Sequence, residues 1–504
     1  MDEPATLLTR TDVSLHADPT RVLARLFVPG HELLGDHESR ASGVLGRILA
    51  LPEAAVAATL RRVHVRYAGR HRDLPGVLLA HYQQIAHRVV DDATLTAARR
   101  ALIGACFTHE FSVEGAALFN PSAVAHPDQS NLPGGHCRFL LSLRAVGEGH
   151  TSSVEFRVGV LGPPGGGLII EDPGCHVESG LARSSSHDRG LFAELLAEEG
   201  ADADSASYLV AHLPENFHED DLERALAALT GQPGTRHTDN TGALARRLAR
   251  CSYEVEFAPL STIPERVLWP HAPSESHGIE DARFVRFVDD DGSLSYRATY
   301  TAFDGDRIAP QLIETDDFRC FRMSQLAGPA AKNKGLALFP RKVRGRYLAL
   351  SRWDRESTAI ASSRDGRWWG DPRTLHAPSR PWELIQTGNC GSPVETEAGW
   401  LVLTHGVGPM REYSIGALLL DLDDPSRVIG DLDEPLLSPE ADERDGYVPN
   451  VVYSCGGLRH EDQLLLPYGA SDSSVRFAVV DLPRLIDRLV ADGPPATMRP
   501  KTLT

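Results

Sequence analysis

The feature that most constrains the fold is a series of short β-rich runs, separated by turn residues, in the second half of this 504-residue chain. Runs such as 347–350 and 400–403 have the apolar, β-prone composition of strands. They group into units of roughly 45 to 65 residues. Five such units cover residues 107–172, 253–318, 320–376, 384–440 and 447–489. Repeated small sheets that close radially form a β-propeller, whose central channel collects residues from every sheet. The pattern therefore predicts a mainly β protein built around a β-propeller.

Two stretches outside these units have helical spacing instead. Apolar residues before residue 106 recur at intervals of three and four, and Pro52 lies where a helix can begin. Leu191, Leu195 and Leu196 follow the same spacing in the middle of the chain. The sequence thus predicts a helical N-terminal cap at 1–106, a propeller built from 107–172 and 251–492, a helical insertion at 173–250 and a C-terminal tail at 493–504.

Charge and cysteine content exclude several classes of protein. Lys and Arg total 51 against 69 Asp and Glu, and the net charge of −18 argues against nucleic acid or an anionic membrane as the general partner. No run approaches the roughly 20 apolar residues of a membrane span, and the start, Met1-Asp2-Glu3-Pro4, lacks the pattern of a secretion signal. The seven cysteines include no Cys-x-x-Cys pair and no zinc-like spacing. We therefore expect reduced thiols, a cytoplasmic location and no metal.

Polar segments recur close to the predicted strand ends. Segment 276–283 places Glu280 and Asp281 beside a histidine, a glycine and an arginine, directly before the strand-like run 284–288. Acids at the mouth of a strand are placed to face a cleft, so Asp281 is a candidate catalytic acid. The other polar segments are 119–122, 332–335, 404–407 and 448–451.

Taken together, these segments resemble glycoside hydrolase family 130, the mannoside phosphorylases and related β-mannosidases. The resemblance covers about 110–172 and 252–490, and it implies a five-bladed propeller and an inverting mechanism. The helical N-terminus and the insertion depart from the compact family pattern. The matching elements are Asn-Pro at 120–121, Gly-x-Glu-Asp-x-Arg at 278–283, Asn-Lys and Phe-Pro-x-Lys within 333–342, His-Gly-Val at 405–407, Gly-Ala-Leu-Leu-Leu-Asp-Leu-Asp-Asp-Pro at 416–425, Val-Pro-Asn-Val at 448–451 and Tyr-Gly-Ala-x-Asp at 468–472.

The resemblance also implies a role for each matching residue. Asp281 would be the general acid, passing its proton to the glycosidic oxygen through a hydroxyl of the bound mannose. Inorganic phosphate, the co-substrate, is already an anionic nucleophile, whereas an inverting hydrolase needs a second carboxylate to activate water. No organic cofactor is implied. The phosphate-binding positions are Lys332, Asn333, Arg352, His405 and Arg144, and the substrate-binding positions are Asn120, Glu280, Arg283, Tyr300 and Asp472.

Three functions remain open on the sequence. The first is an inverting phosphorylase of glycosyltransferase type, which would convert β-linked manno-oligosaccharides and phosphate into α-mannose 1-phosphate and a shortened acceptor. The second is an inverting β-mannoside hydrolase, for which Arg352 would be dispensable. The third is a non-catalytic propeller that binds glycans or a protein, for which Asp281→Asn would be silent.

Smaller alternatives remain open within the first reading. Glu280 is the alternative acid, and Tyr300 is either a core residue or a sugar-stacking platform. The glycosidic linkage and the acceptor sugar are not specified by these residues. The helical extension is a candidate surface for a homo-oligomer.

Overall fold

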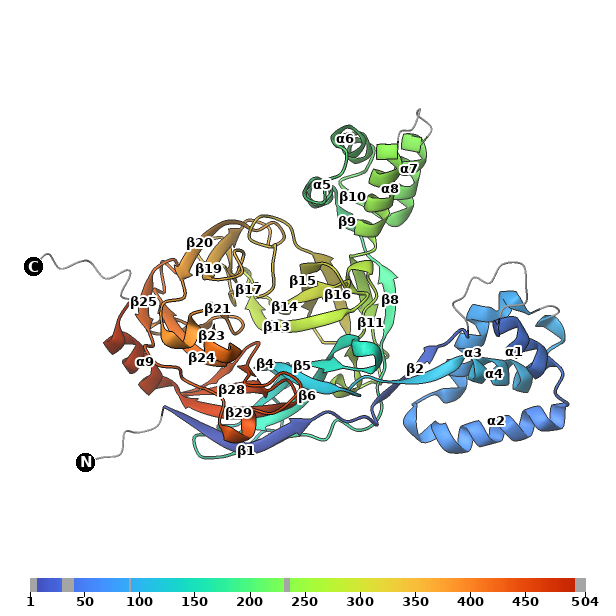
Figure 1. The fold of residues 1–504 in the computed structure, drawn as a ribbon, viewed down its shortest axis with the longest axis horizontal. Coiled ribbons are helices and arrows are strands. Elements are labelled where there is room, and N and C mark those ends of the chain that lie inside the picture. Colours follow the sequence, from blue (N-terminus) through green and yellow to red (C-terminus); the bar gives the residue numbers. More distant parts are fainter. Residues whose placement is uncertain (1–6, 30–39, 90–91, 231–235, 495–504) are drawn as a thin grey trace, which may run out of the picture.

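The computed structural model describes residues 7–29, 40–89, 92–230 and 236–494. The chain is mainly β, with one helical body at the N-terminal side and a second inserted between strands (Figure 1). This confirms the predicted mainly β class. Most of the predicted C-terminal tail, from residue 495, and residues 1–6 lie outside the described residues.

The largest sheet has eleven strands and combines the first predicted unit with the second. Its strand order is β4-β5-β6-β13-β14-β15-β16-β11-β8, with β7 and β12 paired to β6. The strands are β4 (Ala117–Ala125), β5 (Cys137–Val146), β6 (Ser152–Leu161), β7 (Leu168–Ile170), β8 (Leu181–Ser184), β11 (Tyr253–Glu256), β12 (Val267–Leu268), β13 (Gly278–Val288), β14 (Leu294–Phe303), β15 (Ile308–Thr315) and β16 (Cys320–Gln325).

Three smaller sheets follow in chain order. The first contains β17 (Ala337–Leu338), β18 (Tyr347–Ser351), β19 (Thr358–Ser363) and β20 (Gly370–His376). The next contains β21 (Gln386–Asn389), β22 (Val394–Thr396), β23 (Gly399–Val407), β24 (Tyr413–Leu420) and β25 (Val428–Asp431). The last contains β26 (Val452–Tyr453), β27 (Leu458–His460), β28 (Gln463–Ala470), β29 (Ser474–Asp481) and β1 (Leu8–His16).

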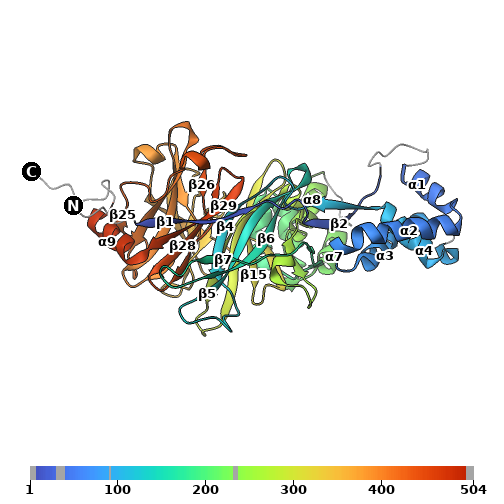
Figure 2. The same ribbon diagram turned by 90° about the horizontal axis from the view of Figure 1, so that it is seen from below.

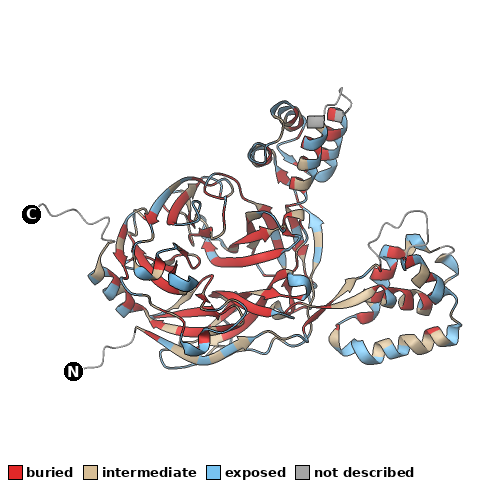
Figure 3. Cartoon of the chain, in the orientation of Figure 1, coloured by how far each residue is buried: buried red, intermediate tan, exposed pale blue. Residues whose placement is uncertain are grey.

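Neighbouring sheets pack against one another around a common centre (Figure 1). Contacts join β4 to β13, β14 to β17, β18 to β21 and β24 to β26, and β28 of the last sheet contacts β4 of the first. A strand between two such neighbours is covered on both faces, so its sequence is a continuous apolar run rather than an alternating one. Accordingly β23 is buried at every position, as is β28 (Figure 3).

The N-terminal strands differ from the predicted helical cap. β1 pairs antiparallel with β29, so residues 8–16 complete the last sheet, and Figure 2 shows this strand running along the side of the sheets. β2 (Val22–Leu26) pairs with β3 (Thr108–Ser112) and forms a ribbon that leads to the helices. The prediction of a helical region from residue 1 is therefore wrong for residues 8–26. Likewise β8, predicted to be part of the insertion, pairs with β11 at the edge of the eleven-stranded sheet.

The helices form two bodies with separate cores. The N-terminal body contains α1 (Arg40–Leu49), α2 (Glu53–Tyr67), α3 (Leu74–Ile85) and α4 (Ala97–Cys106). The insertion contains α5 (Arg189–Glu198), α6 (Ala203–Ala211), α7 (Glu219–Thr230) and α8 (Arg236–Ala249), with the two short strands β9 (His187–Asp188) and β10 (Asn216–Phe217). The last helix, α9 (Leu482–Asp492), packs on β25.

Pro52 caps α2 as predicted, and the predicted helices around Leu191 and Leu222 are α5 and α7. In the part of the chain that the structure describes, no single helix is long and apolar enough to span a membrane, although α1 and α2 together, with a bend of 114° between them, meet the length and composition test.

Candidate active site

Six of the predicted site residues line one pocket of about 230 Å³. They come from all parts of the β region, and the pocket also receives residues that the sequence analysis did not single out. The six are Asn120, Asp281, Arg283, Arg352, His405 and Asp472. Residues separated by more than 300 positions in the chain are therefore gathered at one site.

Two of these residues lie at irregularities in their strands. The pairing of β13 with β14 shifts register between Glu280 and Arg283, and that of β4 with β5 shifts between Phe119 and Ser122. Within these bulges Asp281 and Asn120 have φ angles of 56° and 49°, which are uncommon for residues other than glycine. A bulge redirects a side chain out of the regular alternation. Here it brings Asn120 Nδ2 to 2.7 Å from Asp281 Oδ1, to which it donates a hydrogen bond.

The Asp281 carboxyl is buried among cations. Burial alone would raise its pKa, but Arg144, Arg283 and Lys334, together with the hydrogen bond from Asn120, have the larger combined effect and lower the pKa below the ordinary value. Arg144 Nη1 lies 3.7 Å from Asp281 Oδ1. In the unliganded protein Asp281 is therefore an anion.

Glu280, the alternative acid, is already engaged. Its Oε1 accepts a hydrogen bond from Arg144 Nη2 at 2.6 Å, and its Oε2 is paired with Lys334 Nζ. Glu280 does not line the pocket, whereas Asp281 and Lys334 do. This arrangement favours Asp281 as the acid that meets a ligand, with Glu280 holding two cations beside it.

Arg283 forms the floor of the pocket. Its side chain is almost fully buried, and it donates hydrogen bonds to the Asp281 carbonyl at 2.9 Å and to the Tyr453 hydroxyl at 2.7 Å. Burial lowers the pKa of Arg283, but its interactions with Tyr453, Cys455 and Asp281 outweigh this effect, and the pKa is raised. Arg283 thus fixes the backbone that follows the bulge.

Arg352 and His405 form a second part of the site. Arg352 Nη1 lies 3.2 Å from His405 Nε2, and His405 Nδ1 lies 3.2 Å from the Asn389 carbonyl. Burial, and then the charge of Arg352, lower the pKa of His405 well below its ordinary value, so the ring is neutral. Since a guanidinium only donates, His405 Nε2 accepts from Arg352 and Nδ1 donates to Asn389.

The Arg352 guanidinium remains available to a ligand. Within the described residues it has no carboxylate partner. Buried polar atoms without a hydrogen-bond partner among these residues also occur on three pocket side chains, at Asn120 Oδ1, Arg283 Nε and Arg352 Nε. Because buried polar groups are nearly always paired in a folded protein, the two arginine Nε–H groups indicate a ligand with acceptor atoms, and Asn120 Oδ1 indicates a ligand with a donor such as a hydroxyl.

Asp472 is the second carboxyl of the pocket. It follows β28, has a φ of 50°, and its pKa is raised to about 7 by burial and then by the negative charge of Asp281, against the opposing effects of Arg144 and Arg411. Arg411 lies between β24 and the strand that carries His405, so charges from both parts of the site act on Asp472.

Five predicted residues lie outside the pocket. Two of them, Arg144 and Glu280, pair with each other, and Arg144 also approaches Asp281. Asn333 donates a hydrogen bond from Nδ2 to the Arg352 carbonyl at 3.0 Å, so it supports the site without lining it. Tyr300 is 1% exposed and donates its hydroxyl to Glu275 at 2.5 Å, so it is a core residue and its prediction as a substrate contact is wrong.

Lys332 is also misplaced by the prediction. Its side chain is half exposed, and Nζ lies 3.7 Å from Glu198 of the helical insertion. Lys334, two residues later, lines the pocket in its place. The residues around both lysines form turns rather than a strand, so side-chain direction does not follow from sequence position. Further pocket residues that the sequence analysis did not select are Gln386, Asn389, Arg411, Tyr413 and Tyr453.

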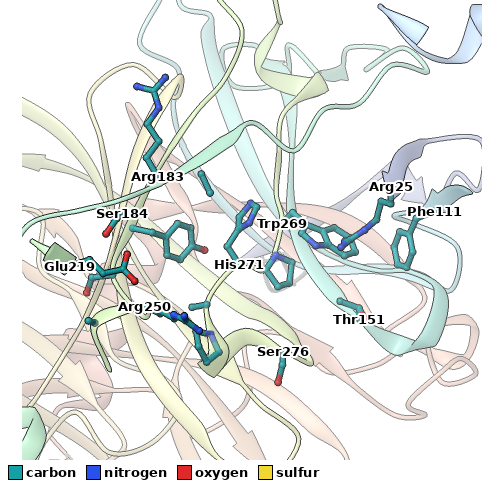
Figure 4. Close-up of a pocket in the computed structure, with 17 residues that line it drawn as sticks. Arg25, Phe111, Thr151, Arg183, Ser184, Glu219, Arg250, Trp269, His271 and Ser276 are labelled. Atoms are coloured by element: carbon teal, nitrogen blue, oxygen red, sulfur yellow. The ribbon is translucent and has the colours of Figure 1, made fainter. Parts of the chain in front are cut away.

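Two other features bear on the choice of site. No group of three or more His, Cys, Asp or Glu residues that could hold a metal occurs within the described ranges. A larger cavity of about 740 Å³ lies between the β2–β3 ribbon, β8 and residues 269–276 (Figure 4). There Arg25 lies over the Trp269 ring at 4.1 Å and Phe111 packs edge-on against the same ring. None of the predicted site residues is among the described residues that line this cavity.

The chain is similar in sequence to known proteins. A family model described as beta-1,4-mannooligosaccharide phosphorylase matches residues 257–490. A 1,2-beta-oligomannan phosphorylase of Thermoanaerobacter sp. is 36% identical over 41% of this chain and 70% of its own. A beta-1,2-mannobiose phosphorylase of Listeria innocua is 34% identical over 45% of this chain and 64% of its own. The solved structure of the Listeria enzyme with beta-1,2-mannobiose covers 76% of this chain and 93% of its own, at 24% identity and a TM-score of 0.44. The matched region contains the acid, the cations and the histidine of the pocket, and the chain belongs to glycoside hydrolase family 130.

Proposed function

We propose that this protein catalyses the inverting, reversible phosphorolysis of β-mannosides, in which inorganic phosphate releases α-mannose 1-phosphate from a manno-oligosaccharide. The main support is that an acid and an uncommitted arginine occupy different parts of one pocket. Asp281 is surrounded by Asn120, Arg144 and Lys334, whereas Arg352 is paired with neutral His405 and has no carboxylate partner among the described residues. Membership of the family supports the same reaction, since the relatives named above are phosphorylases of β-mannosides.

The proposed step balances without a general base. A phosphate oxygen attacks the anomeric carbon, the bond from that carbon to the glycosidic oxygen breaks, and the leaving oxygen takes the proton that Asp281 supplies. Hydrogen phosphate loses its own proton in forming the sugar phosphate, and that proton returns the acid to its starting state. Phosphate binding also explains how an acid with a lowered pKa becomes protonated, because an anion held by Arg352 offsets the cations that stabilise the Asp281 anion.

The test is turnover of β-linked manno-oligosaccharides of defined linkage, with and without phosphate. We expect mannose 1-phosphate of the α configuration, formed only with phosphate, and synthesis of β-mannosides from it in reverse. Release of free mannose at a rate that ignores phosphate would contradict the proposal.

One observation favours hydrolysis as the second candidate. Asp472 lines the pocket and its pKa is raised to about 7, which suits a general base near neutral pH. The base of an inverting hydrolase acts from the face of the sugar opposite the acid, so this role would require Asp472 to lie across the sugar from Asp281. Hydrolysis would require Asp472 for turnover and would not require Arg352, so the two substitutions separate the candidates.

The proposal extends to the architecture. A five-bladed propeller is supported by the contacts that run from sheet to sheet and return from β28 to β4, if the eleven-stranded sheet supplies two blades through β4–β7 and β13–β16. The helical N-terminal body and the insertion are then separate additions to the catalytic domain. An oligomer formed through the N-terminal helices and a cytoplasmic location complete the proposal.

A further inference from the structure

The helical insertion contacts the chain segment that leads into the pocket. Glu198, the last residue of α5, accepts a hydrogen bond from the backbone N–H of Gly328 at 2.7 Å, and its other carboxylate oxygen lies 3.7 Å from Lys332 Nζ. One carboxylate of the insertion therefore holds two points of segment 327–335. Figure 1 shows the insertion as a separate helical body on one side of the sheets.

The start of this segment has little freedom. Ala327 is fully buried in the core of the insertion, among residues such as Leu196 and Leu209. Its backbone carbonyl accepts from Trp369 N–H at 2.8 Å. Gly328 has a φ of 103°, and a Cβ there would lie 2.2 Å from the Trp369 carbonyl oxygen. Segment 327–335 is thus fixed at its first two residues jointly by the insertion and by Trp369, which directly precedes β20.

The end of the same segment forms one wall of the pocket. Asn333 donates to the Arg352 carbonyl, Lys334 pairs with Glu280, and the Gly335 carbonyl accepts from Asn389 Nδ2 at 2.5 Å. Arg352 is held from this side also through Ser351, whose hydroxyl donates to the Ala330 carbonyl at 2.8 Å. A shift of segment 327–335 would therefore move Lys334 and the backbone that carries Arg352.

We propose that the insertion is a positioning element for the anion-binding side of the site, and that Glu198 is the positioning residue through which it acts. This inference rests on the proposed function for the identity of the anion, which is inorganic phosphate. Its physical basis is that the fixed geometry of a guanidinium and an ammonium group determines how well they bind one anion. Glu198 does not touch the pocket, so its effect on the sugar is indirect.

Substitutions at Glu198 test the proposal. Glu198→Ala removes both contacts, Glu198→Gln keeps an acceptor for Gly328 N–H, and Lys332→Gln removes the ion pair alone. We expect Glu198→Ala to raise the KM for phosphate roughly tenfold, with a much smaller change in the KM for the mannoside. Glu198→Gln and Lys332→Gln should each retain most of the wild-type affinity for phosphate. Glu198→Asp, shorter by one methylene, should act in the direction of Glu198→Ala and serves if the alanine variant does not fold.

Glu199→Ala is the matched control. Glu199 joins the insertion to the sheets through Arg307 of the β14–β15 turn at 3.0 Å and pairs with Arg247 of α8 within the insertion at 2.7 Å, but among the described residues it has no ion pair or hydrogen bond to segment 327–335. An equal loss in Glu199→Ala, or phosphate constants within twofold of the wild type in both Glu198→Ala and Glu198→Asp, would overturn the proposal. Calorimetric binding of inorganic phosphate to each variant gives a readout that does not depend on turnover. A wild type that binds phosphate but cleaves mannosides without it would refute the proposed function and leave this comparison valid.

Discussion

Replacing Arg352 by glutamine tests the phosphate side of the site most directly. One Nη of Arg352 is paired with neutral His405, and the backbone carbonyl of Arg352 accepts a hydrogen bond from Asn333. The other N–H groups of the guanidinium have no protein acceptor among the described residues. Hydrogen bonds to charged groups contribute about 1.5 to 3 kcal/mol each. If Arg352 gives phosphate two such bonds and water replaces part of the loss, the cost is about 3 kcal/mol, or roughly 150-fold in kcat/KM for phosphate.

The assay is initial-rate phosphorolysis of a manno-oligosaccharide at varied phosphate and at varied sugar. The loss should appear mainly in the KM for phosphate, because no ion pair or hydrogen bond joins Arg352 to Asp281 among the described residues. Arg355→Gln is the control, since Arg355 is an exposed arginine three residues later that does not line the pocket. A decrease of less than threefold in Arg352→Gln, or a decrease equal to that of Arg355→Gln, would refute the assignment of phosphate to Arg352.

Three further substitutions test the acid side. Asp281→Asn should retain the fold, because the amide oxygen can still accept a hydrogen bond from Asn120, but it should lower kcat by about 10² to 10⁴. Rates with an aryl mannoside, whose leaving group needs no proton, should fall far less. Equal losses with both substrates would contradict the role of Asp281 as the acid. Glu280→Gln removes the negative charge between Arg144 and Lys334 and should lower the pKa of Asp281 further. The alkaline limb of the pH–rate profile should therefore shift to lower pH. A limb that does not move, or that shifts to higher pH, would contradict this effect of Glu280 on Asp281. Because burial and Asp281 raise the pKa of Asp472 to about 7, the folded protein holds a proton there that the unfolded chain loses above its ordinary value of 3.8. The free energy of unfolding therefore falls as pH rises through the range between these two pKa values. Asp472→Asn should remove up to roughly 4 kcal/mol of this decrease, measured by thermal unfolding from pH 4 to pH 8. An unchanged pH dependence would show that Asp472 does not titrate in this way.

Local sequence patterns were sufficient to predict most of the β-rich segments. Runs such as 400–403 are apolar and β-prone because β23 is covered on both faces, and this condition is visible in the sequence without knowledge of its partners. The pairing of residues 8–16 with residues 474–481 could not be predicted in this way. It joins opposite ends of the chain, and an edge strand with one partly exposed face has only a weak local signal.

The sequence analysis selected six residues that line the pocket, but it did not predict their geometry. Segment 278–283 identified Asp281, but the bulge that turns Asp281 toward Asn120 depends on the pairing of two strands and has no fixed sequence signal. The exchange of Lys332 for Lys334 has a similar cause, because Glu198 of a separate helical body pairs with one lysine and Glu280 with the other. Tyr300 was open between core and sugar contact, and only its hydroxyl partner, Glu275, decides for the core.

The acid side of the pocket depends on contacts between the first and last sheets of the chain. Asn120 of β4 orients Asp281 of β13, and Asp472 approaches them from the turn that follows β28. This approach leaves little room at Gly469, because a Cβ there would lie 3.2 Å from Asn120 N and 3.3 Å from Phe119 Cβ, and a larger residue would require these neighbours to shift. The cation side is built separately, from segment 327–335, Arg352 and His405. The pKa of Asp281 responds to both sides, since Asn120 and Arg144 act on it from the first sheet and Lys334 acts on it from that segment. We therefore expect an anion bound beside Lys334 and Arg352 to raise the pKa of Asp281, which would favour the protonated acid when the nucleophile of the proposed phosphorolysis is bound.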